Sequence, residues 1–246
     1  MQFMKFELDL PYIPDEEFVA RIIKNSGCNR TEATKQDYEA NWKAKRREFA
    51  LQTRCTSSFF ERVAAHPAGK SCRKILVECI SNATEQHIRQ ALGVIFVPVQ
   101  FDYNMFISLD DFGKKKYSLA ILMDGIRKIA LHCNWSMTPF DSACSAVVDA
   151  NYCNECFWQK SAKNPHNGFT AKILLQHEVG VIHISIVIQS KNGDIIAQKT
   201  IISELPDEYA YDQHLGSIKW SSNTQVMLSN QNNNKNWIVD VEPNSI

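Results

Sequence analysis

The spacing of apolar residues changes once along this chain, and that change limits the folds open to it. From about Asp110 to Cys133 apolar side chains recur every three or four residues, the period of an amphipathic helix. After Gly168 the period becomes two, because four isoleucines alternate with other residues between Ile182 and Ile188. We therefore expect an α+β fold, with a mainly helical N-terminal portion that holds a small β element and a C-terminal antiparallel β-meander.

The N-terminal portion carries several helix signals. Pro14 followed by three acidic residues is a typical helix start. Asn82 and Glu85 have the spacing of a capping box, which predicts a helix that ends near Leu92. Further helices are expected at 35–54, 58–65, 110–133 and 138–149. The apolar run at 94–101 predicts a buried strand, with 104–108 as its candidate partner.

Strand and turn signals occupy the C-terminal portion. The stretch Lys191–Asp194 reads KNGD, which predicts a hairpin turn with positive φ at two positions. Strands are expected at 182–189, 195–203, 216–220, 224–229 and 236–241. A boundary between a helical region, 1–150, and a β region, 168–246, falls best within 151–168, and the sequence leaves open whether both form one continuous domain.

The charge balance gives no sign of a nucleic-acid or membrane surface. Lys and Arg together number 27, as do Asp and Glu, so the formal net charge is zero. The basic residues between Lys43 and Arg54 accompany Tyr38 and Trp42, a combination that can bind nucleic acid by phosphate contacts and stacking. Because the chain as a whole has no electropositive bias, we favour a solvated helix face and do not expect nucleic acid binding.

The N-terminus and the cysteines bear on the compartment. The first seven residues alternate and resemble no signal peptide, and no apolar run is long enough to span a bilayer. We therefore expect a cytoplasmic protein without a membrane partner. The 8 cysteines are then expected to be free and mostly buried, since thiols stay reduced in that compartment.

A group of cysteines and histidines offers one route to metal chemistry. Cys153 and Cys156 have the spacing of a zinc-binding pair, and Cys133, Cys144 or His166 could complete the ligands. A second closely spaced pair is missing, whereas zinc sites normally have two. Buried structural cysteines are therefore the favoured interpretation, no cofactor is expected, and the metal site remains the alternative.

Common catalytic signatures are missing from the sequence. There is no G-x-S-x-G elbow, no G-x-x-x-x-G-K-[ST] phosphate loop and no G-x-G-x-x-G. His177 and His183 are six residues apart, so they do not form the H-E-x-x-H pair of a metalloprotease, which needs one helical turn between them. These absences favour a binding role over an enzymatic one.

The second half of the chain resembles the immunity proteins with which bacteria neutralise polymorphic or contact-dependent toxins. The resemblance lies in a lysine-rich start to a long helix, an Asn-Trp pair at its end and a strand-rich tail with late tryptophans: Lys114–Leu119, Asn134, Trp135, Leu215–Trp220 and Trp237. It implies a non-catalytic protein that binds a toxin domain stoichiometrically and occludes its active site. The alternative is a metal-dependent enzyme or zinc-stabilised protein that uses the Cys/His group between residues 132 and 166.

A partner-binding surface is expected in the loop from Pro206 to His214. Interface centres are enriched in Tyr and Trp, and acidic groups beside aromatic ones would suit a basic toxin domain. The residues that we expect to contact the partner are Asp207, Glu208, Tyr209, Tyr211 and Asp212.

Overall fold

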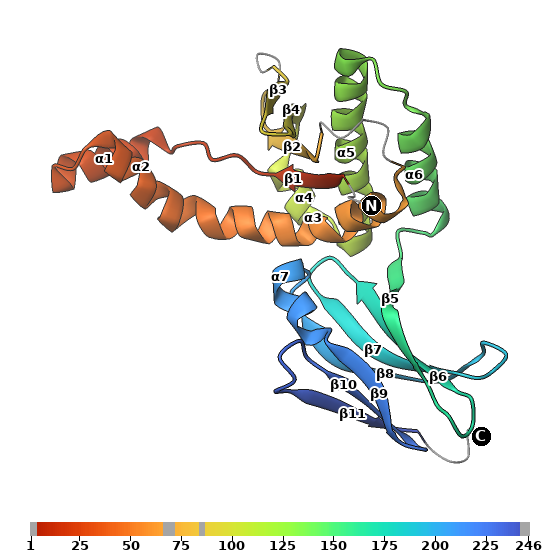
Figure 1. Ribbon diagram of the computed structural model, residues 1–246. Helices are drawn as coiled ribbons and strands as arrows, with labels where there is room; N and C mark the ends of the chain where they lie inside the picture. The colour runs from red at the N-terminus through yellow and green to blue at the C-terminus, as the bar shows by residue number, and fades with distance from the viewer. Residues whose placement is uncertain (1–3, 66–71, 84–86, 242–246) are drawn as a thin grey trace. The chain divides into compact units, whose positions relative to one another are not determined.

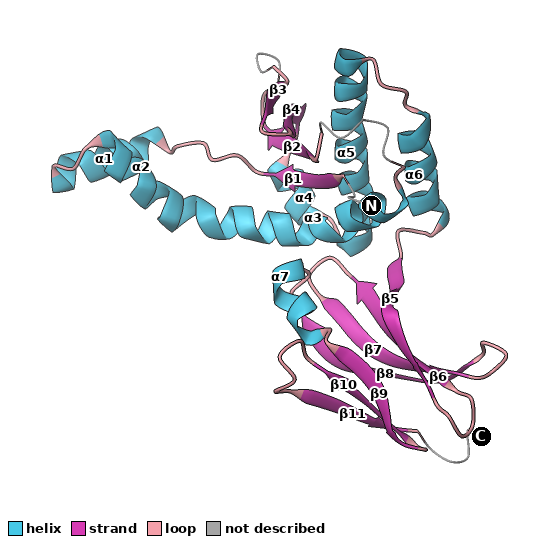
Figure 2. Cartoon of the chain, viewed as in Figure 1, coloured by secondary structure: helices cyan, strands magenta, loops and turns pink. Residues whose placement is uncertain are grey.

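The computed structural model describes residues 4–65, 72–83 and 87–241. The chain has an α+β fold and divides into two compact units, residues 1–152 and residues 153–246. Helices dominate the first unit and antiparallel strands the second (Figures 1 and 2).

The first unit contains a mixed four-stranded sheet of order β1-β2-β4-β3. β1, β2 and β4 run parallel, and the short β3 pairs antiparallel with β4. Its strands are β1 (Lys5–Asp9), β2 (Lys74–Ile80), β3 (Arg89–Ala91) and β4 (Val94–Gln100). Its helices are α1 (Glu16–Ser26), α2 (Arg30–Asp37), the π-helical turn η1 (Tyr38–Trp42), α3 (Lys43–Val63), α4 (Tyr103–Ser108), α5 (Asp111–Cys133) and α6 (Thr138–Asp149).

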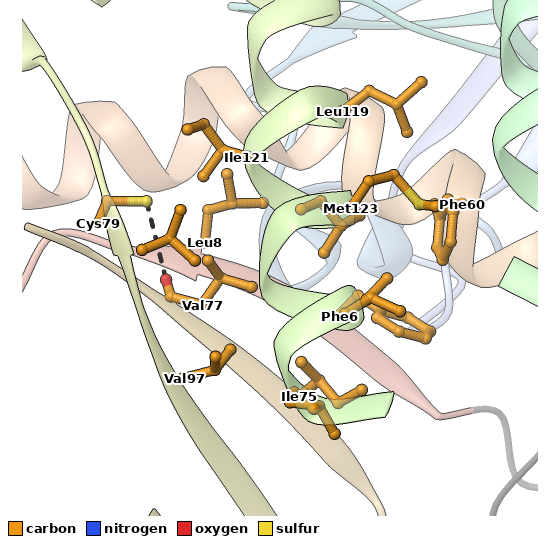
Figure 3. Close-up of a cluster of buried hydrophobic side chains, with 14 of the residues drawn as sticks. Phe6, Leu8, Phe60, Ile75, Val77, Cys79, Val97, Leu119, Ile121 and Met123 are labelled. Atoms are coloured by element: carbon orange, nitrogen blue, oxygen red, sulfur yellow. Dashed lines mark hydrogen bonds between the residues drawn. The ribbon is translucent and has the colours of Figure 1, made fainter. Parts of the chain in front are cut away.

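The core of the first unit forms where α5 crosses the sheet. Apolar side chains from β1, β2 and β4 gather around this helix, together with Phe60 of α3 (Figure 3). Gly125 allows the close approach, because a Cβ there would lie 2.8 Å from a methyl of Val77 and 3.1 Å from one of Val97. The helix stripe predicted between residues 110 and 133 is thus the face that covers the parallel strands.

The free edge of β1 is closed by side chains of α3. The Phe6 N–H donates to Glu61 Oε1 at 2.8 Å, and Arg54 donates to both carboxylate oxygens of Glu61 at 2.8 Å. Both side chains of this ion pair are only 12% exposed. Farther along, Arg46 forms a bidentate pair with Asp9 at 2.7 Å. Side chains of α3 therefore cover this edge of the sheet, and one of them satisfies the Phe6 N–H.

The segment after β1 is held by a buried carboxylate. Asp37 is 1% exposed and accepts from the Tyr12 hydroxyl at 2.6 Å, the Asp15 N–H at 2.9 Å and the Asn41 amide at 2.8 Å. Burial alone would raise the pKa of Asp37, but these three hydrogen bonds outweigh it and lower the pKa. Burial and the hydrogen bond to Asp37 raise the pKa of Tyr12 to about 12. This network joins the α1–α2 pair to the rest of the unit.

The second unit is a sandwich of two antiparallel sheets. Their orders are β5-β6-β7-β8 and β11-β10-β9, and apolar residues from both form one core. The strands are β5 (Asn154–Lys163), β6 (Thr170–His177), β7 (Ile182–Gln189), β8 (Ile195–Glu204), β9 (Ser217–Ser222), β10 (Gln225–Ser229) and β11 (Asn236–Asp240). Between β8 and β9 lie the one-turn helix α7 (Glu208–Tyr211) and the 3₁₀ turn η2 (Asp212–His214).

The alternating isoleucines of β7 supply the centre of this core. Ile182, Ile184, Ile186 and Ile188 are all at most 1% exposed. On the opposite face of β7, Ser185 is also fully buried, and its hydroxyl lies 3.0 Å from that of Thr200 on β8. The isoleucine face of β7 therefore lies in the core of the sandwich, and the opposite face is also buried at Ser185 and Val187.

Two predicted elements of the first unit are wrong. The helix expected from Asn82 to Leu92 is replaced by β3, because Leu92 and Gly93 adopt positive φ and turn the chain into a hairpin with β4. Glu85, which the capping box required, lies outside the described residues. The strand expected at 104–108 is α4, which Asp102 caps by accepting the Met105 N–H at 3.0 Å.

Three other details also differ from expectation. The helices expected at 35–54 and 58–65 are not separate, since α3 continues to Val63 without a break. The 191–194 turn has positive φ at Gly193 but not at Asn192. The register of β7 and β8 shifts beside Gln189, and such an irregularity increases the local twist of the strands. β2, the central parallel strand, was not predicted.

Candidate functional site

The loop expected to contact a partner lies between β8 and β9 in the second unit. Asp207 caps α7 by accepting the Tyr209 N–H at 3.0 Å, which fixes the backbone of this turn. Tyr209 is 95% exposed, and Leu205, at the start of the loop, is 41% exposed. A short rigid turn thus presents one aromatic and one aliphatic side chain to solvent.

The structure gives Tyr211 and Asp212 different surroundings from Tyr209. Tyr211 is buried in the sandwich core, with its ring centroid 6.3 Å from that of His177. The backbone carbonyl of Asp212 accepts from the Gln231 amide at 2.8 Å, which ties the end of α7 to the loop between β10 and β11. Among the tyrosines of this loop, Tyr209 is exposed and Tyr211 is the anchor that holds the turn.

The base of the loop carries an acid–imidazole pair. Glu204 Oε2 lies 3.3 Å from His214 Nε2, and the His214 ring packs edge-on to Trp237 with centroids 5.4 Å apart. The hydrogen bond from the Leu205 N–H lowers the pKa of Glu204 most, and the hydrogen bond with His214 lowers it further. Glu204 is therefore ionised at neutral pH and adds to the negative charge of Asp207 and Glu208 in this stretch.

The cysteines and histidine of the metal alternative do not assemble in the part of the chain that the structure describes. Cys133 ends α5 in the first unit, whereas Cys153, Cys156 and His166 belong to the second. Within the described ranges, no group of three or more His, Cys, Asp or Glu side chains is arranged to hold a metal ion. None of the 8 cysteines, which all lie in the described ranges, forms a disulfide bond.

Three of the basic residues of α3 are engaged in ion pairs. Lys43 pairs with Glu39 at 2.7 Å, while Arg46 and Arg54 pair with Asp9 and Glu61 as described above. Acidic partners therefore neutralise much of the positive charge that the sequence places on this helix.

Lys45 differs from these neighbours, and it lies in a pocket that the sequence did not indicate. The hollow has a volume of about 430 Å³ and lies where the parallel strands β1, β2 and β4 end. The residues that line it include Ile13, Trp42, Lys45, Phe101 and Tyr103. Ligand sites in sheets with parallel strands commonly lie outside the carboxyl ends of the strands.

Sequence reasoning missed this pocket because it missed β2. Without that strand, the ends of β1 and β4 have no reason to lie together. The sequence did contain a signal for this strand, because the apolar run Ile75–Val77 lies between Lys74 and a polar stretch that begins at Ser81. A parallel central strand of this kind would have brought the three carboxyl ends to one edge.

Comparison with models of protein families, with curated proteins and with solved structures finds no match to this chain. None of the helices in the described ranges is both long enough and apolar enough to cross a membrane.

Proposed function

We propose that this chain is a non-catalytic protein-binding protein, and that the turn Leu205–Tyr209 of the second unit contacts the partner. The observation that carries the proposal is the exposure of Tyr209, at 95%, on a turn whose backbone is capped by Asp207 and anchored by Tyr211. A tyrosine has few rotatable bonds, so its burial against a partner loses little conformational entropy. Tyrosine is accordingly enriched among the residues that dominate binding energies.

The charge of the turn suggests the chemistry of the partner. Glu204, Asp207 and Glu208 place three carboxylates within five residues of one another, next to the exposed side chains of Leu205 and Tyr209. Acidic groups at the rim of an apolar contact accelerate association with a basic surface. A basic protein domain is therefore the partner that fits this turn best.

The more specific form of the proposal is a stoichiometric immunity protein of a bacterial toxin system. The resemblance in the second half of the chain supports it, and so does the acidic character of the turn, since nuclease toxins bind a polyanion and have basic surfaces. Such a protein acts by occluding the toxin's active site, so it needs no catalytic residues of its own. The metal-dependent alternative has less support, because its proposed ligands are not gathered among the described residues.

A capture experiment with matched variants tests the proposal. The full chain would be isolated under mild conditions from the cell that makes it, and the complex weighed by native mass spectrometry. Wild-type protein should carry a second chain in a fixed ratio. Tyr209→Ala should weaken that complex by about 2 kcal/mol or more, roughly 30-fold in Kd. Ile195→Ala serves as the control, because Ile195 is an exposed apolar residue elsewhere in the same unit, at 58%.

Co-expression then tests the immunity role. The captured partner should arrest growth when expressed alone and should be harmless with the wild-type chain or Ile195→Ala. Tyr209→Ala should restore the arrest. A partner that is harmless by itself would refute the immunity role but leave the binding proposal intact. A complex that forms equally well with Tyr209→Ala would refute the proposed surface.

A further inference from the structure

The pocket of the first unit contains a lysine whose environment differs from that of every other basic residue described above. Lys45 Nζ lies 3.9 Å from the ring centroid of Tyr103 and 4.6 Å from that of Trp42. No carboxylate in the described ranges forms an ion pair with it, although Lys43 and Arg46, on the same helix, each have one at 2.7 Å. Among the described residues, the ammonium group is thus held by two aromatic faces and by no carboxylate.

The aromatic groups around Lys45 are themselves fixed in place. The Trp42 Nε1–H donates to the Leu10 carbonyl at 3.1 Å, and this bond orients the indole. Tyr103 is the first residue of α4, whose start is capped by Asp102. The cage is therefore formed before any ligand arrives, which reduces the entropy lost on binding.

Partial burial makes the unpaired charge costly. Burial lowers the pKa of Lys45, and no neighbouring charge contributes to the shift. An anion placed in the pocket would offset this cost and form a charge-assisted hydrogen bond with the ammonium group. The lining is mixed. Its apolar part, with Leu10, Ile13 and Phe101, would contact the body to which the anion is attached, and its polar part includes Ser81, Gln100, Asn104 and the carboxylate Asp102, whose Oδ1 already accepts the Met105 N–H.

We propose that this pocket binds an organic carboxylate with a planar or apolar body, and that Lys45 is the residue that recognises the carboxylate. Such a group occurs in a free aromatic or aliphatic acid and at the C-terminus of a peptide. The proposal concerns the first unit alone and does not depend on the partner surface proposed for the second.

Fluorine NMR of the full chain labelled with 5-fluorotryptophan tests this proposal. The resonance of Trp42 would be assigned with Trp42→Phe and followed during titration with benzoate. We expect a saturable shift of this resonance, with those of Trp158, Trp220 and Trp237 unchanged. Benzamide, which has the same body without the charge, and inorganic phosphate, which has charge without the body, should each bind at least about tenfold more weakly.

Two variants with the same charge change identify the residue. Lys45→Met should weaken benzoate binding at least about tenfold, whereas Lys43→Met, on the same helix, should leave it unchanged. N-acetylphenylalanine represents a peptide C-terminus, so whether it or benzoate binds more tightly identifies the source of the carboxylate. The proposal would be overturned by the absence of a Trp42 shift with both acids, by equal binding of benzamide or phosphate, or by an equal response in a folded Lys45→Met protein.

Discussion

Two edge strands of this molecule, β1 in the first unit and β8 in the second, are protected in different ways. The edge of β1 is closed by α3, whose Glu61 accepts the Phe6 N–H and is itself held by Arg54. β8 ends the sheet order β5-β6-β7-β8, so no strand of its own sheet pairs with its outer side. Its exposed Lys199 lies opposite Ile186, a core residue of β7, and Ile201 forms a bulge beside Ser185.

The contrast shows how each edge relates to function. At β1, a mostly buried ion pair accepts the Phe6 N–H, and α3 covers the edge. At β8, an exposed lysine on the same side of the sheet as Ile186 and a bulge discourage unspecific pairing but leave the edge accessible. β8 leads directly into the turn that presents Tyr209. The open edge and the proposed partner surface are therefore consecutive in the chain, and the closed edge belongs to the unit with the Lys45 pocket.

Breaking the ion pair at β1 should have the largest effect. Glu61→Gln removes the carboxylate that pairs with the mostly buried Arg54. We therefore expect a loss of about 3–5 kcal/mol in the free energy of unfolding. Urea unfolding followed by the helical circular dichroism signal measures it, since the long helices all belong to the first unit. Glu39→Gln removes an exposed ion pair and should cost less than about 0.5 kcal/mol. Equal losses in the two variants would mean that the ion pair at the edge of β1 stabilises the fold no more than an exposed ion pair does.

Removing the buried carboxylate behind β1 should have a smaller, pH-dependent effect. At pH 7, Asp37→Asn should lower the free energy of local opening of α1 and α2 by about 2 kcal/mol, because hydrogen bonds to a charged acceptor are lost. The folded-state pKa of Asp37 is lowered, so its contribution is fully present above the unfolded pKa of about 3.9. It is lost as the pH falls through the folded pKa.

Hydrogen exchange in α1 and α2, corrected for the intrinsic rates, measures this difference at each pH. The gap between wild type and Asp37→Asn should stay constant from about pH 7 to pH 5 and shrink below about pH 4. Glu17→Gln, an exposed change on α1, should match wild type throughout. A gap that widens in acid would contradict the assigned direction of the pKa shift.

Changing the open edge should affect association more than stability. Lys199→Ile replaces the exposed lysine of β8 that lies opposite Ile186. We expect the free energy of unfolding to change by less than about 0.5 kcal/mol. Self-association should increase, since the edge then presents a continuous apolar face to a second strand. Sedimentation velocity detects the larger species. Lys24→Ile makes the same change on α1, away from any strand edge, and should remain as monodisperse as wild type.

Much of the fold could be predicted from local patterns. α5 and the β7–β8 hairpin have apolar spacings that match a single secondary structure over many residues, and both predictions are confirmed. The failures occurred in short segments whose structure depends on one cap or one partner strand. A short segment such as 104–108 becomes a helix because Asp102 caps it, and β3 exists only because it pairs with β4.

The candidate sites were harder to predict from the sequence, because local patterns do not report which side chains are buried or which distant segments meet. The pattern of acids and tyrosines indicated the Asp207–Asp212 turn, but it could not distinguish the exposed Tyr209 from the buried Tyr211 two residues later. The Lys45 pocket needs three strand ends, a π-helical turn and the start of α4 to meet. Those segments are far apart in the chain, so no local motif records the arrangement.

Hydrogen–deuterium exchange of the complex with the captured partner tests the central claim most directly. We predict protection on binding in peptides that cover residues 200–212, at the end of β8 and in α7, and no change in peptides that cover 42–49 and 79–83 of the first unit. Protection confined to the first unit, or none in the 200–212 stretch, would contradict the assignment of the partner surface to the Tyr209 turn.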